Sequence, residues 1–189
     1  MKESVQIARV RVMVEIALMA ALAIVLSNVK LFRMPYGGSL SLEMIPVFYI
    51  AARYGGLAGC LTGLLLGLGQ LFFGPYVVHP AQLVLDYPLA FALIGVGGFI
   101  PARNLFLTEM GVILGSLFRY ASHVISGVIF FSEYAPEGSN VWIYSLGYNA
   151  SYLVPQVVLA LIIVYPIIRL MTRFDGESVD AGGKQGGGK

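Results

Sequence analysis

Charge is scarce in this chain: only 12% of its 189 residues are charged, whereas 58% are hydrophobic. Soluble domains typically carry charge on about a quarter of their residues. The composition therefore excludes an ordinary soluble domain and indicates an integral membrane protein. The formal net charge is only +2 and no basic cluster interrupts the sequence, so nucleic acid is not an expected partner.

Cysteine and histidine are also scarce, with one cysteine and two histidines. A single cysteine, Cys60, excludes an internal disulfide, and no Cys/His spacing is typical of a metal site. A complete phosphate-binding loop is missing as well, because the final Gly-Gly-Gly-Lys has no Ser or Thr after it. We therefore expect no metal, no cofactor and no ATP hydrolysis by this chain itself, and we do not expect an enzyme.

Long hydrophobic runs are the main feature that is present. A helix needs about 20 apolar residues to cross a membrane, which gives room for about six crossings in a chain of this length. The sequence predicts an all-α membrane domain over residues 1–174 and a disordered, polar, glycine-rich tail over residues 175–189. The predicted spans are residues 12–29, 42–53, 56–73, 81–99, 107–131 and 143–170.

The distribution of Lys and Arg between these spans predicts the orientation. One side would hold most of the basic residues, and the other side would hold only Lys30 and Arg33. Cytoplasmic loops carry the excess of positive charge, so both termini are predicted to be cytoplasmic. The loops at residues 30–41, 74–80 and 132–142 would then face outside.

Small residues recur at helical spacing on two predicted spans. Gly55, Gly59, Gly63 and Gly67 follow one another every four residues on the third span. Such spacing lets two helix backbones approach closely, so a tight structural contact is expected there. Ala17 and Ala21 make a similar but weaker pattern on the first span.

Three polar side chains in the spans predict a site. A carboxylate in hydrocarbon costs several kcal/mol and usually marks function, which singles out Asp86. At 1.5 Å of rise per residue, Asp86, His123 and Asn149 would all lie roughly 8–12 Å below the outer surface. Their common depth predicts one pocket. The alternatives are a structural salt bridge between Asp86 and Arg119, and a packing role for His123.

The helical faces add further candidates to this pocket. Arg119, His123, Gly127 and Phe131 form one stripe, in which Gly127 would leave room beside the imidazole. Ser145 and Asn149 share a face of the sixth span, and the outer loops are rich in aromatic residues, among them Tyr36, Tyr76, Tyr134 and Trp142. An unpaired anion among aromatic walls favours a small cationic ligand. An interfacial aromatic belt is the alternative for Tyr134 and Trp142.

At these residues the sequence resembles a known family. Residues 119–134 (RYASHVISGVIFFSEY) resemble the fifth helix and following loop of the thiamine-specific S component of energy-coupling factor (ECF) transporters. Leu85-Asp86-Tyr87 resembles an element of its fourth helix, Tyr144-Ser145 followed by Asn149 the start of its sixth, and residues 15–23 its alanine-rich first helix. The resemblance covers nearly the whole chain up to about residue 172.

The resemblance implies a six-helix thiamine-binding protein in a prokaryotic plasma membrane, with an outward-facing pocket. Its partners would be a membrane scaffold protein and two ATPase subunits. Asp86 would face the thiazolium cation, His123 and Phe131 would pack on the ligand rings, and Tyr144 and Asn149 would hydrogen-bond the aminopyrimidine.

The remaining implied positions lie at the wall and on the first helix. Tyr76 and Tyr87 would complete the pocket wall, together with the first outer loop, which carries Tyr36. Ala17 and Ala21 would lie on the face that docks against the scaffold protein.

Three positions depart from the family pattern: Asp86 stands where Glu is usual, and Phe131 and the Gly37-Gly38-Ser39 loop stand where Trp is found. These departures could change the affinity or the preferred ligand, and other interpretations also stay open. They are an S component for another vitamin or precursor, such as riboflavin or a pyrimidine, a proton-coupled carrier acting alone, and an intramembrane enzyme that uses Asp86 and His123 as a base pair.

Overall fold

The computed structural model describes residues 2–35 and 38–183, with side chains described for residues 6–35 and 38–171. Helices account for most of this part of the chain, together with one short antiparallel hairpin in which Phe32 pairs with Leu40. In chain order the elements are α1 (Lys2–Asn28), β1 (Phe32–Arg33), β2 (Ser39–Leu40), α2 (Met44–Tyr54), α3 (Gly56–Gln70), α4 (Pro80–Val84), the π-helical turn η1 (Leu85–Leu89), α5 (Ala90–Ile94), the 3-10 turn η2 (Gly95–Phe99), α6 (Leu105–Phe130), the 3-10 turn η3 (Ser132–Tyr134) and α7 (Val141–Gly183).

These helices fall where the hydrophobic runs predict spans, since α4, η1, α5 and η2 follow one another without a break over Pro80–Phe99. Within the described residues, four helical stretches are long and apolar enough to cross a membrane: Gln6–Asn28, Pro80–Phe99, Leu105–Phe130 and Val141–Met171. Helix α3 is apolar but shorter. The predicted class of helical, multi-pass membrane protein is therefore confirmed, while the exact number of crossings stays a prediction.

Helix α2 is short and belongs to the interior of the bundle. Residues 44–51 are buried without interruption, and a helix that is apolar and buried all round packs against other helices instead of facing solvent on one side. Its neighbours include α1, α3 and α7. The sequence correctly placed this helix but could not show that other helices surround it.

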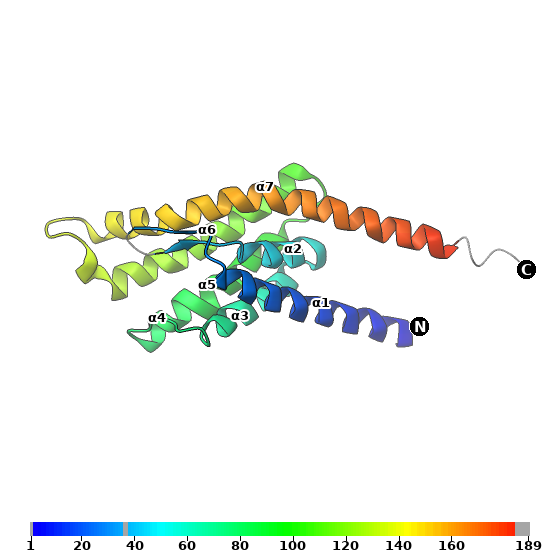
Figure 1. Cartoon of the computed structure of the whole chain (residues 1–189), viewed down its shortest axis with the longest axis horizontal. Coiled ribbons are helices and arrows are strands. Elements are labelled where there is room, and N and C mark those ends of the chain that lie inside the picture. Colours follow the sequence, from blue (N-terminus) through cyan, green and yellow to red (C-terminus); the bar gives the residue numbers. More distant parts are fainter. Residues whose placement is uncertain (1, 36–37, 184–189) are drawn as a thin grey trace, which may run out of the picture.

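Both ends of the described chain lie at the same end of the molecule. In Figure 1 the beginning of α1 and the end of α7 point to one side, while α4 and the connection between α6 and α7 lie at the opposite side. This arrangement agrees with the even number of spans on which the predicted orientation depends. The cytoplasmic location of the termini stays a prediction.

Helix α7 continues to Gly183 and so includes part of the polar segment over residues 175–189, for which a disordered tail was predicted. Residues 184–189 of that segment lie outside the described residues, and the disordered tail stays a prediction. Extending an existing helix adds one hydrogen bond for each residue that is fixed and needs no new nucleus. A polar segment can therefore continue a long apolar helix, which composition alone does not predict.

The glycine repeat on α3 makes the close helix contact that its spacing predicts. Gly59 lies against Gly95, Gly63 against the backbone of Phe91, and Gly67 against the backbone of Tyr87, and a Cβ atom at any of the three glycines would overlap these neighbours. Helix α3 therefore supports the segment that carries Asp86 from behind.

The two alanines of α1 face away from the bundle. Ala17 and Ala21 are exposed, whereas Ile16, Ala20 and Ala23 on the same helix are buried in the core. The exposed face therefore carries small side chains that a second helix can approach closely.

Candidate functional site

One cavity of about 660 Å³ gathers the predicted pocket residues. Every one of these residues that the structure describes lines its wall: Tyr76, Asp86, Tyr87, His123, Gly127, Phe131, Tyr144, Ser145 and Asn149. Tyr36 lies outside the described residues. Common depth, shared helical faces and the family resemblance thus pointed to cavity-lining positions at α6, α7, η1 and the connection between α3 and α4.

Asp86 reaches the cavity from a distorted turn. Pro88 has no N–H group and cannot donate to the carbonyl one turn before it, and the chain adopts the π-helical turn η1 here. Such turns occur frequently at functional sites. The Ser122 hydroxyl donates a hydrogen bond of 2.7 Å to the Leu85 carbonyl, so α6 holds the turn beside the cavity.

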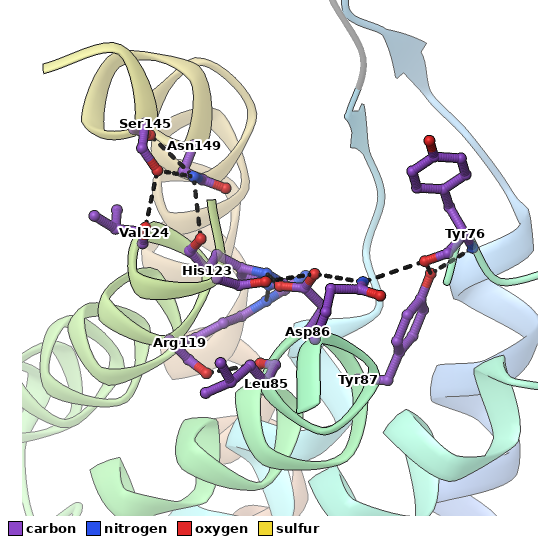
Figure 2. A network of polar contacts seen from close by, with 12 residues as sticks. Tyr76, Leu85, Asp86, Tyr87, Arg119, His123, Val124, Ser145 and Asn149 are labelled. Carbon is purple, nitrogen blue, oxygen red and sulfur yellow. Dashed lines mark hydrogen bonds and ion pairs between the residues drawn. The ribbon is translucent and has the colours of Figure 1, made fainter. Parts of the chain in front are cut away.

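The Asp86 carboxylate is held by three side-chain contacts (Figure 2). Its Oδ2 accepts from Gln82 Nε2 at 2.7 Å and from Ser126 Oγ at 2.9 Å, and its Oδ1 lies 3.1 Å from His123 Nδ1. Among the residues the structure describes, no Lys or Arg lies within ion-pair distance of it. Hydrogen bonds stabilise the partly buried anion, and its charge stays available to a ligand.

Arg119 pairs with a different carboxylate, so the predicted alternative of an Asp86–Arg119 salt bridge is wrong. Its Nη2 lies 2.9 Å from Glu43 Oε1, and the two side chains are only 4% and 6% exposed. Glu43 Oε2 also accepts from Gln70 Nε2 at 2.9 Å. The guanidinium lies over the Phe91 ring, 4.3 Å from its centroid. Both charges of this pair are thus satisfied locally beside the cavity.

His123 lines the cavity and is fixed at both ring nitrogens. Its Nδ1 faces Asp86, and its Nε2 lies 3.4 Å from the Nε–H group of Arg119, which donates to it. The Tyr152 ring meets the imidazole edge-on, with 6.2 Å between centroids. The His123 side chain therefore packs against its neighbours and also forms part of the cavity wall.

The polar face of α7 bonds to α6. Ser145 Oγ donates to the Val124 carbonyl at 3.0 Å, and Asn149 Nδ2 donates to the His123 carbonyl at 3.4 Å and to the Ser145 carbonyl at 2.9 Å. Tyr152 donates to Asn149 Oδ1 at 2.7 Å. Figure 2 shows the contacts of Ser145 and Asn149 with α6 as the α7 end of the polar network that continues through His123 to Asp86. The amide of Asn149 fixes the two helices and keeps one acceptor position free on Oδ1.

Gly127 makes room for α7 as well as for the cavity. A Cβ atom there would overlap Ser145 Oγ and touch Asn149 Nδ2. The sequence predicted space beside His123, whereas the structure places the Ser145 hydroxyl directly against this glycine.

We expect Gly127→Val to push α7 away from α6 and weaken ligand binding at least about tenfold, because it disturbs two hydrogen-bonded side chains at once. Calorimetric titration measures the loss. Gly147→Val is the matched control, since a Cβ atom there meets nothing within 4 Å. Equal affinities of the two variants would contradict this role of Gly127.

Aromatic side chains surround the cavity on the side of α4 and η3. The hydroxyls of Tyr76 and Tyr134 lie 3.2 Å apart, and the Tyr76 ring stacks on Phe131 with 6.1 Å between centroids. The Tyr87 hydroxyl accepts from the Tyr76 backbone N–H at 2.9 Å. Tyr134 lines the cavity, whereas the exposed Trp142 does not. The interfacial-belt interpretation therefore fits Trp142 better than Tyr134.

Sequence reasoning missed several polar residues of this site. Gln82 precedes Asp86 by one helical turn, which is a signal that the i, i+4 rule offers. Glu43 is a carboxylate at the start of a predicted span, and the argument that singled out Asp86 applies to it equally. Gln70 and Gln156 are amides within predicted spans, so the reasoning that singled out Asn149 applies to them as well. Ser126 gave no comparable signal, because serine is common in membrane helices and its partner Asp86 comes from another helix.

Comparisons with known proteins identify relatives of nearly the whole chain. A family model described as thiamine transporter protein matches residues 13–175. The thiamine transporter ThiT of Bacillus subtilis (strain 168) is 44% identical over 179 residues, covering 87% of this chain and 92% of the relative. ThiT of Lacticaseibacillus paracasei is 30% identical over 187 residues, covering 88% and 93%. A solved structure of ThiT from Listeria monocytogenes has a TM-score of 0.80 at 29% identity, covering 88% of this chain and 97% of that one.

Proposed function

The chain belongs to the thiamine transporter protein family, and we propose that it is the substrate-binding S component of an ECF-type importer, which binds thiamine in the cavity around Asp86. It is a multi-pass bacterial membrane protein. The observation that carries the proposal is the Asp86 carboxylate, whose bonding partners among the described residues are Gln82, Ser126 and His123, in a cavity with aromatic walls.

The chemistry of thiamine matches this cavity. Its thiazolium ring carries a permanent positive charge, which Asp86 would balance and the rings of Tyr76, Phe131 and Tyr148 would contact through cation–π attraction. The cavity volume of about 660 Å³ is typical of small-molecule sites. A neutral or anionic ligand would leave the carboxylate without a counter-charge.

The aminopyrimidine ring would lie toward α7. Tyr144 lines the cavity there and offers a hydroxyl group, and the free acceptor position on Asn149 Oδ1 suits the ring's exocyclic amine. Ser145 would not donate a hydrogen bond to the ligand, because its hydroxyl donates to the Val124 carbonyl. It would support the ligand-binding wall, with Gly127 packed against it.

The energy for import would come from partner proteins, a membrane scaffold protein and two ATPase subunits. The test is uptake of labelled thiamine by proteoliposomes that contain this chain alone or together with those partners. Uptake should require the partners and ATP. Uptake by the chain alone, driven by a pH gradient, would contradict the proposal and favour a proton-coupled carrier.

The exposed alanines of α1 are the proposed docking face for the scaffold protein. Ala17→Trp should leave thiamine binding unchanged but reduce co-purification of the partners at least about tenfold, because a large side chain prevents close helix approach. Val158→Trp on the exposed side of α7 is the matched control and should not affect assembly. Normal co-purification with Ala17→Trp would rule out this face.

A further inference from the structure

A buried ion pair lies beside the cavity, where α2 approaches α6. Arg119 and Glu43 are joined at 2.9 Å and are almost inaccessible to solvent. Arg119 Nη1 also donates to Gln156 Oε1 at 3.1 Å, and Gln156 Nε2 donates to the Ser39 carbonyl of β2 at 2.7 Å. These contacts fix the guanidinium on several sides, and its Nε–H group points to His123.

The identity of this donor determines where the imidazole proton lies. An arginine N–H group can only donate, so His123 Nε2, 3.4 Å away, must accept and carries no proton. The proton of a neutral imidazole is then on Nδ1, which lies 3.1 Å from Asp86 Oδ1. In the other tautomer two lone pairs would face each other at that distance. A doubly protonated imidazole would have no acceptor for Arg119 and would balance the charge of Asp86 itself.

Glu43 neutralises the charge of Arg119. An unpaired guanidinium in the cavity wall would attract anions and reduce the negative potential around Asp86. Paired with Glu43, Arg119 offers its Nε–H group to His123 without adding net charge to the wall. Asp86 then remains a carboxylate with neutral donors, which is the condition for selecting a cation.

We propose that Arg119, neutralised by Glu43, is a positioning residue that holds His123 in the neutral tautomer whose Nδ1 proton is donated to Asp86, and thereby preserves the charge with which the cavity selects a cationic ligand. The inference deepens the proposed function and rests on it for the identity of the ligand. The state of His123 can be measured without any ligand.

The experiment reads the two ring nitrogens of His123 directly. The chain has only two histidines, and His79→Asn leaves His123 alone while keeping a side chain that can accept the hydrogen bond from Ala81 N–H, as His79 does. This variant is labelled with ¹⁵N-histidine and purified through a tag that contains no histidine. We expect ¹⁵N NMR to show that Nδ1 of His123 is protonated and that Nε2 is not.

The decisive variant is Glu43→Leu/Arg119→Met in the same background. Replacing a buried ion pair by apolar residues of similar volume often preserves the fold, so this variant removes the donor to Nε2 without leaving a lone charge. We expect His123 to lose its single-tautomer signature and the Kd for thiamine to rise about tenfold, as for the loss of roughly one hydrogen bond. An unchanged signature and affinity would overturn the proposal and leave the pair a purely structural role.

A second variant covers failure of the double variant to fold. Arg119→Lys keeps a positive charge for Glu43, but an ammonium group has no second arm fixed toward His123. In this variant too, we expect His123 to lose its single-tautomer signature. Retention of the Nδ1–H signature would overturn the proposal. If the unmodified chain shows that signature and the variants lose it, but the unmodified chain binds no thiamine, the proposed function fails while the positioning role of Arg119 stands.

Discussion

Asp86→Asn should weaken thiamine binding about 100-fold, the largest loss we expect from a single substitution in the cavity. Truncating one partner of a buried charge pair typically costs 2–5 kcal/mol, and about 2.7 kcal/mol corresponds to 100-fold. The variant keeps the size of the side chain but removes the counter-charge of the thiazolium. Its amide group would also present N–H donors to Gln82 and Ser126, which donate to Asp86.

Two control variants distinguish the loss of the Asp86 charge from damage to the fold. Asp86→Glu restores the carboxylate at a position where the resemblance leads us to expect Glu, and it should bind thiamine within about threefold of the unmodified chain. Glu109→Gln removes a carboxylate from a part of α6 that does not line the cavity, and it should have no effect. If Asp86→Asn also bound thiamine within threefold, Asp86 would not be the counter-charge.

Removing only one member of the Arg119–Glu43 pair should destabilise the protein by about 3–5 kcal/mol, because an uncompensated charge is left buried. Arg119→Met leaves the Glu43 carboxylate with Gln70 as its remaining hydrogen-bond partner among the described residues. Thermal unfolding in detergent, followed by circular dichroism, measures the loss.

The double variant Glu43→Leu/Arg119→Met is the matched comparison. It should recover most of the stability that Arg119→Met loses, although Gln156 loses a donor to its Oε1 in both variants. Equal losses in the single and double variants would show that packing, and not the buried charge, determines the stability of this region.

Hydrophobic runs and polar residues at a common depth predicted much of this structure. The spans follow from run lengths, since a membrane helix must satisfy all its backbone groups internally. Asp86, His123 and Asn149 were placed in one pocket by helical rise and loop charge alone. Rise per residue is nearly constant along a helix, so depth is predictable even where side-chain contacts are not.

Contacts between distant helices were not predictable in the same way. Arg119 and Glu43 are separated by 76 positions, and no periodicity links α6 to α2. Arg119 was therefore assigned to the wrong carboxylate in one alternative. The π-helical turn at Pro88 was also missed, because a pattern with a period of 3.6 assumes a regular helix and cannot show a local change of hydrogen-bond register.

Calorimetric titration of the detergent-purified chain with thiamine tests the central claim most directly, with riboflavin and thiamine diphosphate titrated in parallel. The account predicts tight binding of one thiamine per chain and no binding of riboflavin, because only a cation satisfies Asp86 in this cavity. Absence of thiamine binding by a sample that still unfolds cooperatively would contradict the account. The cavity would then have to accommodate a different ligand, despite the family to which the chain belongs.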